Sequence, residues 1–185
     1  SALALECLHN AFLVHDDVED ESEQRRGKDT INKHYGDNIA VNVGDAMNVL
    51  ALGMLGNNDA VLGKQRSRKV FDEFYHMIIE SVEGQAIELG WSKDNEFNLT
   101  EEDYLRMVLK KTSWYTTIHP VRVGVLIASS GKEDLDRFNN FGFYLGAAFQ
   151  IQDDLLNLTG SANEYGKEIH GDIFEGKRTL MLLHL

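Results

Sequence analysis

The chain has 185 residues, of which 43% are hydrophobic and 26% are charged, a composition typical of a globular domain large enough to bury a core. Its formal net charge of −12, from 30 acidic and 18 basic residues, argues against nucleic acid as a partner. The single cysteine, Cys7, cannot form an internal disulfide and has no Cys or His neighbour at zinc spacing. We therefore predict one domain in a reducing, cytoplasmic location.

No uninterrupted apolar run reaches the roughly 18 residues of a membrane span, and the N-terminus lacks the basic-then-apolar order of a signal peptide. We expect no stable insertion into a membrane. The chain begins inside an apolar periodic pattern without a helix cap and ends at TLMLLHL without a stop signal. We therefore expect that it is truncated at both ends.

Helices are expected throughout, because the chain has one proline and its Val, Ile and Thr residues do not form alternating runs. The first helix covers the apolar repeat from Leu3 to Leu13 and ends in an acidic cluster. After a loop over residues 21–37, a second helix is predicted over 38–57, where Ala and Gly favour close approach to a neighbour. A long amphipathic pattern predicts a third helix over 67–91.

The next helix begins with a capping box. Thr100 and Asp103 have the required spacing, and the helix is predicted to run to Ile118. Pro120 then interrupts or kinks it, and apolar residues continue over 121–130.

A further long apolar helix is predicted over residues 134–158, with a second acidic cluster at its C-terminal end. Residues 159–171 are expected to form a loop before a last apolar helix. The sequence therefore predicts an all-α protein, an antiparallel or orthogonal helix bundle with acidic clusters at like ends of two long helices.

The first acidic cluster, HDDVED, places Asp16, Asp17 and Asp20 at positions i, i+1 and i+4. Residues four apart share a helix face, so Asp16 and Asp20 point the same way with Asp17 on their flank. Oxygen ligands without Cys or His suit a hard cation such as Mg²⁺, which is usually held by one or two carboxylates together with substrate phosphates. Arg25 and Arg26 follow closely, and a metal with guanidinium groups is typical of a diphosphate site.

The second acidic cluster, QIQDDLLN, repeats the pattern with Asp153, Asp154 and Asn157. An acidic run taken alone is as often a solvated face or a helix end. Two such clusters after long apolar runs favour the metal hypothesis, because carboxylates at a helix C-terminus oppose the helix dipole unless a cation compensates them.

Taken in order, HDDVED followed by RRG, then GDA, GQ, KT, FQIQDD and GDIFEGKRTL, the motifs resemble those of the trans-isoprenyl (polyprenyl) diphosphate synthases, including geranylgeranyl and farnesyl diphosphate synthases. The resemblance implies the isoprenoid synthase type I fold around a central cavity, with residues 1–185 as the central portion of a single domain. It also implies a prenyltransferase, usually homodimeric, that ionises an allylic prenyl diphosphate and joins it head to tail (1′-4) to isopentenyl diphosphate. Mg²⁺ is the implied cofactor, with three ions when substrate is bound.

The resemblance assigns roles to residues of this chain. Two aspartate motifs would bind metal, namely Asp16, Asp17 and Asp20 in the first and Asp153 and Asp154 in the second. Five cations would bind diphosphate: Arg26 that of isopentenyl diphosphate, and Arg25, Lys111, Lys167 and Lys177 that of the allylic substrate. The catalytic residues would be Lys111, Thr112 and Gln150, the last two near the nascent carbocation. Without the resemblance, each lysine would be interpreted as a solvated side chain.

Ala11 and Phe12 stand five and four residues before Asp16, where bulky residues limit product length in the family. A small residue followed by one aromatic residue favours a C20 product, with C15 next and longer products as alternatives. Three features depart from the family pattern. Asn157 replaces a usual third Asp, Glu88 replaces a usual Asp, and the upstream glycine-lysine-arginine segment is not in this chain.

Two other functions stay open. A class I terpene cyclase shares the fold and the first motif, but its second motif would have Ser or Thr and then Glu where this chain has Asn157 and Ser161. The other alternative is a catalytically silent regulatory subunit of a prenyl diphosphate synthase. Intact aspartate pairs and both arginines favour an active enzyme over this alternative.

Overall fold

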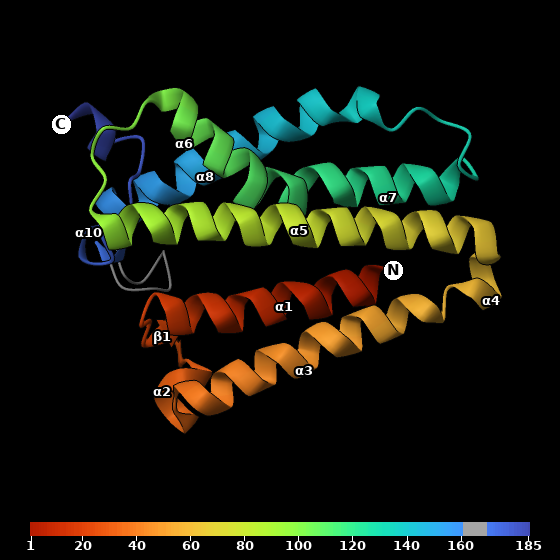
Figure 1. The fold of residues 1–185 in the computed structure, drawn as a ribbon, viewed down its shortest axis with the longest axis horizontal. Coiled ribbons are helices and arrows are strands. Elements are labelled where there is room, and N and C mark those ends of the chain that lie inside the picture. The colour runs from red at the N-terminus through yellow and green to blue at the C-terminus, as the bar shows by residue number, and fades with distance from the viewer. Residues whose placement is uncertain (161–169) are drawn as a thin grey trace. The chain divides into compact units, whose positions relative to one another are not determined.

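The computed structural model describes residues 1–160 and 170–185, which form two compact units. The first unit contains residues 1–67, and the second contains residues 68–160 and 170–185. Within these residues the regular structure is helical except for one two-stranded hairpin, which confirms the all-α prediction (Figure 1). The prediction that residues 1–185 make a single domain stays a prediction.

The first unit is built on two long helices, α1 (Ala2–Glu19) and α3 (Asp37–Gly56), which run antiparallel and pack along their lengths (Figure 1). As predicted, α1 ends in the acidic cluster. The small residues of α3 permit the expected close approach, because a Cβ at Gly44 would lie only 2.3 Å from Nε2 of His15. Glycine at this position therefore lets the imidazole of α1 lie against the backbone of α3.

The segment predicted as a loop over residues 21–37 has more structure than expected. It contains β1 (Gln24–Arg25), β2 (Lys28–Asp29) and α2 (Ile31–Tyr35). The strands pair as an antiparallel hairpin whose central residues, Arg26 and Gly27, have φ of 54° and 72°. Both values are of the sign that a type I′ turn needs, but Arg is an unusual first residue for that turn, which explains why the residue pattern does not predict it.

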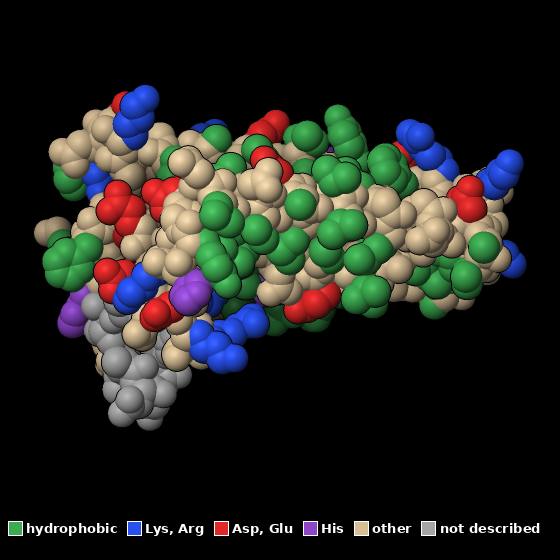
Figure 2. Space-filling model, turned by 90° about the horizontal axis from the view of Figure 1, so that it is seen from below, with side chains coloured by type: hydrophobic (Ala, Val, Ile, Leu, Met, Phe, Trp, Pro, Cys, Tyr) green, Lys and Arg blue, Asp and Glu red, His purple; other side chains and the backbone are tan. Residues whose placement is uncertain are grey.

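The helix α3 exposes several hydrophobic side chains. Five of its exposed side chains are hydrophobic, namely Ile39, Val41, Val49, Leu50 and Leu52, and hydrophobic side chains gather on the face shown in Figure 2. Among the described residues, Asp37–Leu62 is the one stretch long and apolar enough to cross a membrane. Its most apolar 18 residues have a mean hydropathy of 1.4, and 22% of them are buried. Helices that pack against protein share these properties, so the prediction about membrane insertion remains untested.

After the short α4 (Asp59–Leu62) comes α5 (Lys64–Asp94), which extends past both ends of the predicted helix over 67–91. The capping box is confirmed: the Thr100 hydroxyl accepts the Asp103 amide, and the Asp103 carboxylate accepts the Thr100 amide. It opens α6 (Glu101–Val108).

The helix predicted to run to Ile118 is an α-helix only as far as Val108. From Leu109 to Ile118 it is a π-helix, η1, and α7 (His119–Ala128) follows. The Thr117 hydroxyl lies 2.8 Å from the Ser113 carbonyl and 2.6 Å from the Gly142 carbonyl, so it supplies a donor to backbone groups beside the irregular turn. Pro120 is the second residue of α7 and stands at the junction where the π-helix passes into the α-helix.

The 3₁₀ turn η2 (Asp136–Phe138) leads into α8 (Asn139–Thr159), which carries the second acidic cluster at its C-terminal end as predicted. The short α10 (Gly171–Phe174) follows. The last apolar helix is shorter than expected. In the described residues it is only the 3₁₀ turn η3 (Leu182–His184).

In the second unit, glycines bring η1 very close to α5 and α8. A Cβ at Gly84 on α5 would lie 2.2 Å from the Lys111 backbone nitrogen, and one at Gly146 on α8 would lie 2.7 Å from Ser113 Cα. Backbone atoms cannot move away as a flexible side chain can, so these contacts fix η1 against both helices. Four buried residues form a core beside them, namely Tyr104, Met107, Val108 and Ala147.

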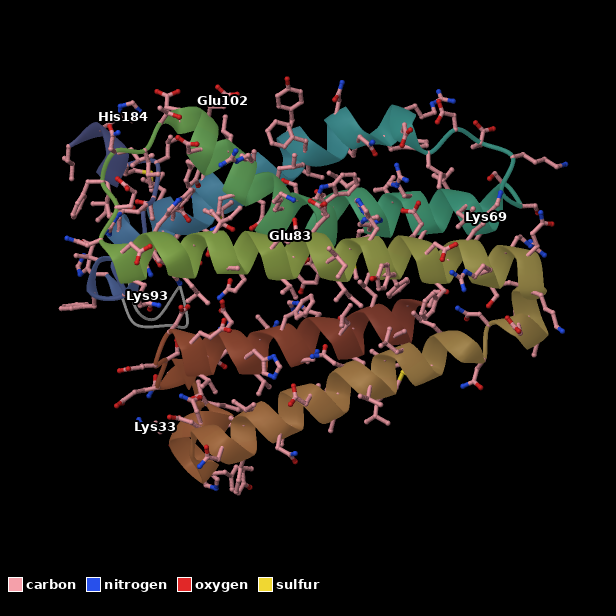
Figure 3. The ribbon with its side chains drawn as sticks, viewed as in Figure 1. Lys33, Lys69, Glu83, Lys93, Glu102 and His184 are labelled. Atoms are coloured by element: carbon pink, nitrogen blue, oxygen red, sulfur yellow. The ribbon has the colours of Figure 1, made fainter. Side chains whose placement is uncertain are left out.

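Charged groups also join η1 to α5. Lys110 Nζ donates to Glu80 Oε2 at 2.9 Å and to Glu83 Oε2 at 2.7 Å, and Glu83 is labelled on α5 in Figure 3. Farther along α5, both Glu73 oxygens accept hydrogen bonds from Arg122 of α7, at 2.7 and 2.8 Å. Burial raises the pKa of Glu73, but hydrogen bonds from Arg122 and His119 outweigh it and lower the pKa to about 2. Glu73 is therefore ionised at neutral pH and ties α5 to α7.

The close approach of α5 and η1 can be tested with two substitutions on one helix. Gly84→Ala should lower the free energy of unfolding by about 1–3 kcal/mol, because the added methyl overlaps the Lys111 backbone. Gly90→Ala, where nothing lies within 4 Å of the added Cβ, should raise it by up to about 1 kcal/mol through helix propensity. Urea unfolding followed by circular dichroism measures both, and equal effects would contradict the close contact.

Candidate functional site

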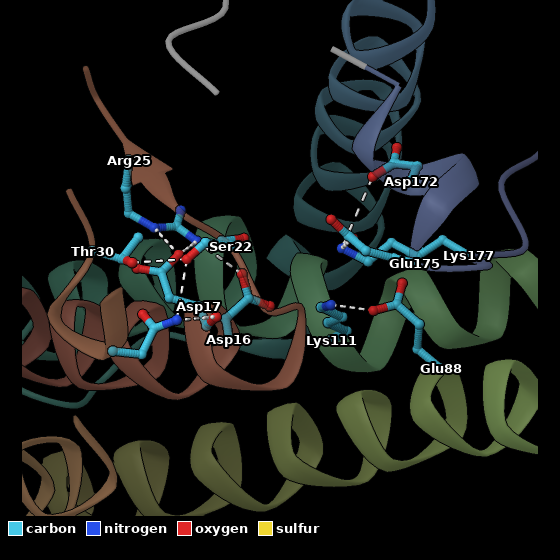
Figure 4. Close-up of polar contacts among 11 residues, drawn as sticks. Asp16, Asp17, Ser22, Arg25, Thr30, Glu88, Lys111, Asp172, Glu175 and Lys177 are labelled. Carbon is cyan, nitrogen blue, oxygen red and sulfur yellow. Dashed lines mark hydrogen bonds and ion pairs between the residues drawn. The ribbon is translucent and has the colours of Figure 1, made fainter. Parts of the chain in front are cut away.

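The first acidic cluster lies at the C-terminal end of α1. Asp16 and Asp17 belong to the helix, and Asp20 caps it with φ of −90° and ψ of −1°, still in the right-handed helical region. Arg25 Nε donates to Asp17 Oδ1 at 2.7 Å, and Arg25 Nη2 donates to Asp16 Oδ2 at 3.1 Å (Figure 4). The structure therefore brings together three of the predicted site residues in the first unit.

Arg25 balances two carboxylates that are largely withdrawn from water. The Asp17 side chain is 7% exposed and that of Arg25 is 16% exposed. Burial lowers the pKa of Arg25, but the hydrogen bonds and charges of Asp17 and Asp16 outweigh it and raise the pKa. Arg26, in contrast, is exposed at the turn of the hairpin. The charge of Arg25 therefore stabilises the carboxylates at the end of α1, whereas the charge of Arg26 faces solvent.

The second acidic cluster contains a chain of hydrogen bonds. Asp154 is buried, its Oδ2 accepts the Tyr104 hydroxyl at 2.6 Å, and its Oδ1 accepts Gln150 Nε2 at 2.8 Å. The Thr112 hydroxyl donates to Gln150 Oε1 at 2.6 Å. Burial raises the pKa of Asp154, and the hydrogen bonds from Tyr104 and Gln150 offset this only in part. Three predicted residues, Thr112, Gln150 and Asp154, thus form one network, and Asp153 lies half-buried beside it.

Two predicted lysines form ion pairs in the second unit (Figure 4). Lys111 pairs with Glu88, and Lys177 Nζ lies 2.6 Å from Glu175 Oε2 and 3.9 Å from Asp172 Oδ1. Burial raises the pKa of Asp172 to about 7, although Lys177 opposes the shift. Lys167, also predicted to bind diphosphate, lies outside the described residues.

Asn157 takes a structural part where the family usually has a third aspartate. It is buried, its Oδ1 accepts the Asp172 amide at 3.3 Å, and its carbonyl accepts the His170 amide at 2.9 Å. An amide can hold α8 to α10 in this way without adding a negative charge beside Asp153 and Asp154.

Tyr104 is the residue that sequence reasoning missed. The available signal was its place on α6, one residue after the capping box, where a buried phenol needs a hydrogen-bond partner. Ala11 and Phe12 lie on α1 one turn before the acidic cluster, the first fully buried and the second half-buried.

The donor set of the acidic clusters fits Mg²⁺. In residues 1–160 and 170–185, no three Asp, Glu, His or Cys side chains are placed to hold a metal ion by themselves. Mg²⁺ commonly takes only one or two carboxylates and completes its shell with phosphate oxygens and water. The carboxylates of Asp16 and Asp17 in the first unit suit an ion bound together with a phosphorylated ligand, and so does that of Asp153 in the second. The two clusters belong to separate units, so their convergence on one ligand stays a prediction.

These features define a class of protein, an all-α chain with two aspartate-rich helix ends and cations on neighbouring elements. A sequence model of the polyprenyl synthetase family matches residues 1–185. The chain belongs to this family.

Among its relatives, the chain is 36% identical over 180 residues to the geranylgeranyl diphosphate synthase of Sulfolobus acidocaldarius, an alignment that covers 97% of this chain and 54% of the relative. It is also 36% identical over 183 residues to the octaprenyl diphosphate synthase of Escherichia coli, covering 99% of this chain and 54% of that protein. The chain spans about half the length of these curated relatives.

A solved structure is also similar to the chain. The crystal structure of geranylgeranyl pyrophosphate synthase from Corynebacterium glutamicum, complexed with isoprenyl diphosphate and magnesium, matches with a TM-score of 0.87 and 29% identity. The match covers 97% of this chain and 54% of that one. It confirms the isoprenoid synthase fold predicted from the motifs.

The role of Arg25 as counter-charge to the first cluster can be tested against its neighbour. Arg25→Gln should lower the free energy of unfolding by about 1–3 kcal/mol, because the carboxylates of Asp17 and Asp16 lose their donor. Arg26→Gln removes the same charge from an exposed position and should change it by less than about 0.5 kcal/mol. Urea unfolding at low ionic strength measures both, and equal losses would mean that net charge rather than the ion pair is responsible.

Proposed function

We propose that this chain is part of a trans-isoprenyl diphosphate synthase, a prenyltransferase that condenses an allylic prenyl diphosphate with isopentenyl diphosphate. The observation that supports it most directly is the grouping of Asp16, Asp17 and Arg25 at one helix end in a chain of the polyprenyl synthetase family. Carboxylates beside a guanidinium suit a diphosphate that carries a metal ion.

The first chemical step would be heterolysis of the allylic C–O bond, in which the electron pair leaves with the diphosphate. A turnover near one per second allows a barrier of about 17 kcal/mol, so the charge must be neutralised where it develops. Bound Mg²⁺, held by Asp16, Asp17, Asp20, Asp153 and Asp154, would supply Lewis-acid stabilisation of that charge.

Cations of the chain would bind the two diphosphates. Arg25 uses Nε and Nη2 for its bonds to Asp17 and Asp16, and Nη1 carries two more N–H groups that can serve a diphosphate oxygen. Arg26, exposed on the hairpin, would bind isopentenyl diphosphate. Three lysines would join Arg25 on the allylic diphosphate, namely Lys111, Lys167 and Lys177. Lys111 and Lys177 each pair with a carboxylate in the structure, that of Glu88 and that of Glu175.

The second step would be attack of the isopentenyl double bond on the allylic carbocation, which forms the new C–C bond. The Thr112 hydroxyl directs its proton to Gln150 Oε1, so its oxygen lone pairs can face a positive centre. A proton is then lost from the condensed cation to the diphosphate, which completes the product. Apolar surroundings would keep water from trapping the cation.

The finer parts of the proposal come from the family resemblance. They are a C20 product, three Mg²⁺ ions with substrate bound, a homodimer and a cytoplasmic location. The names of the relatives include both geranylgeranyl and octaprenyl diphosphate synthases, so product length varies among similar chains. The Corynebacterium glutamicum neighbour, complexed with isoprenyl diphosphate and magnesium, supports the choice of ligand and ion.

The experiment is to incubate the full-length protein that contains this chain with Mg²⁺, isopentenyl diphosphate and each allylic primer, and to identify products by mass spectrometry. We expect elongated prenyl diphosphates, and an approximately 10³-fold or greater loss of kcat in Asp16→Asn, because less of the developing charge is stabilised. Asp94→Asn, an exposed acidic position at the end of α5, is the matched control and should retain activity. A hydrocarbon formed without isopentenyl diphosphate would indicate a cyclase, and an inactive but folded wild type would indicate a silent subunit.

Product length should respond to Phe12. Phe12→Ala removes the aromatic ring one turn before the first acidic cluster and should lengthen the main product by at least one C5 unit, because the tail meets less bulk. Phe141→Ala, at an exposed position near the start of α8, removes the same ring and should leave product length unchanged. Chromatography of the dephosphorylated products gives the distribution. An unchanged distribution in Phe12→Ala would contradict this role.

A further inference from the structure

We propose that Tyr104 is a positioning residue for the second acidic cluster, because its hydroxyl holds Asp154 and thereby orients the end of α8 that carries Asp153. This inference rests on the proposed function, since it concerns how the prenyltransferase site is assembled. Tyr104 lies on α6, outside all the sequence motifs considered above.

The contact between Tyr104 and Asp154 is short and withdrawn from water. The phenol oxygen lies 2.6 Å from Asp154 Oδ2, and both residues are buried, with Tyr104 1% exposed and Asp154 6% exposed. The Tyr104 ring belongs to the core with Met107, Val108 and Ala147, so it is held by packing as well as by its hydroxyl. A buried carboxylate without such a donor would be costly, so the pair restrains α6 and α8 to one register.

The same carboxylate determines which way Gln150 faces. An ionised carboxylate only accepts hydrogen bonds, so the neighbouring amide must present its NH₂ group to Asp154 Oδ1. Its carbonyl oxygen then faces the Thr112 hydroxyl, as observed at 2.6 Å. A donor from Tyr104 on one oxygen and from Gln150 on the other leaves Asp154 little freedom to rotate. The orientation of two proposed catalytic groups, Thr112 and Gln150, thus depends on Asp154.

Asn157 anchors the next turn of the same helix. Positions three apart share a helix face, so Asp154 and Asn157 together fix one face of α8 within the second unit, the first to α6 and the second to α10. Asp153 directly precedes Asp154 in α8. Once this turn of the helix is held in place, the direction in which the Asp153 side chain leaves the helix is also determined. Tyr104 would therefore act on the reaction through Asp154 without touching substrate.

The test is Tyr104→Phe in the full-length protein that contains this chain, because phenylalanine fills the same core volume and removes only the hydroxyl. We expect an approximately 10-fold lower kcat and an approximately 5-fold higher Mg²⁺ concentration for half-maximal rate, of the order found when one positioning hydrogen bond is lost. The KM for isopentenyl diphosphate should stay within twofold, because the proposal assigns that ligand to Arg26. Tyr144→Phe, exposed on α8, is the matched control and should leave all three quantities unchanged.

A second comparison separates positioning from loss of folded protein. If Tyr104 acts through Asp154, Tyr104→Phe should have little further effect on kcat in an Asp154→Ala background, because alanine has no oxygen to accept the Tyr104 hydroxyl and the link is already broken. Equal fold-losses in the two backgrounds would overturn the inference. So would a Tyr104→Phe enzyme whose kcat and Mg²⁺ dependence lie within twofold of wild type, or one whose lost rate equals its lost folded fraction by circular dichroism. Failure of the wild type to condense the substrates would instead reject the proposed function.

Discussion

A carboxylate that is withdrawn from water needs hydrogen-bond donors, and the buried carboxylates of Asp17 and Asp154 each take at least one from another element of the chain. In the first unit Asp17 is held by Arg25 of the hairpin, and in the second Asp154 is held by Tyr104 of α6. Glu73 and Arg122 follow the same rule away from the candidate site. Both acidic clusters are therefore oriented by internal contacts, and neither is only a solvated helix end.

Close packing of helices makes these contacts available. Glycines 84 and 146 let α5 and α8 approach the backbone of η1, and at that distance Lys111 reaches Glu88 on one side and Thr112 reaches Gln150 on the other. The π form of η1 contributes as well, since an extra residue per turn changes which side chains face each neighbour. A side chain at either glycine would overlap the backbone of η1 and push the helices apart at that point.

Several of the predicted diphosphate-binding cations form ion pairs with carboxylates of the chain. The chain carries a net charge of −12, yet Arg25, Lys111 and Lys177 all lie against carboxylates. The cations in these ion pairs already lie against carboxylate oxygens, and a polyanion such as a diphosphate with its metal ion could replace a carboxylate as partner. Asn157 fits the same logic, since it supplies hydrogen bonds at the second cluster without another negative charge.

The sequence alone was sufficient for the helical class, the capping box at Thr100, the end of α1 at the acidic cluster and the family, because these depend on local spacing and on the order of short motifs. It could not reveal the hairpin at Arg26, whose turn residue is atypical, or the π form of η1, which depends on the packing of its neighbours. Nor could it pair Tyr104 with Asp154, since the two residues are 50 positions apart and a place after the capping box does not say which group the phenol meets. Only the tertiary structure decides which donor meets which buried carboxylate, because that choice depends on distances between helices and not on the residues within one.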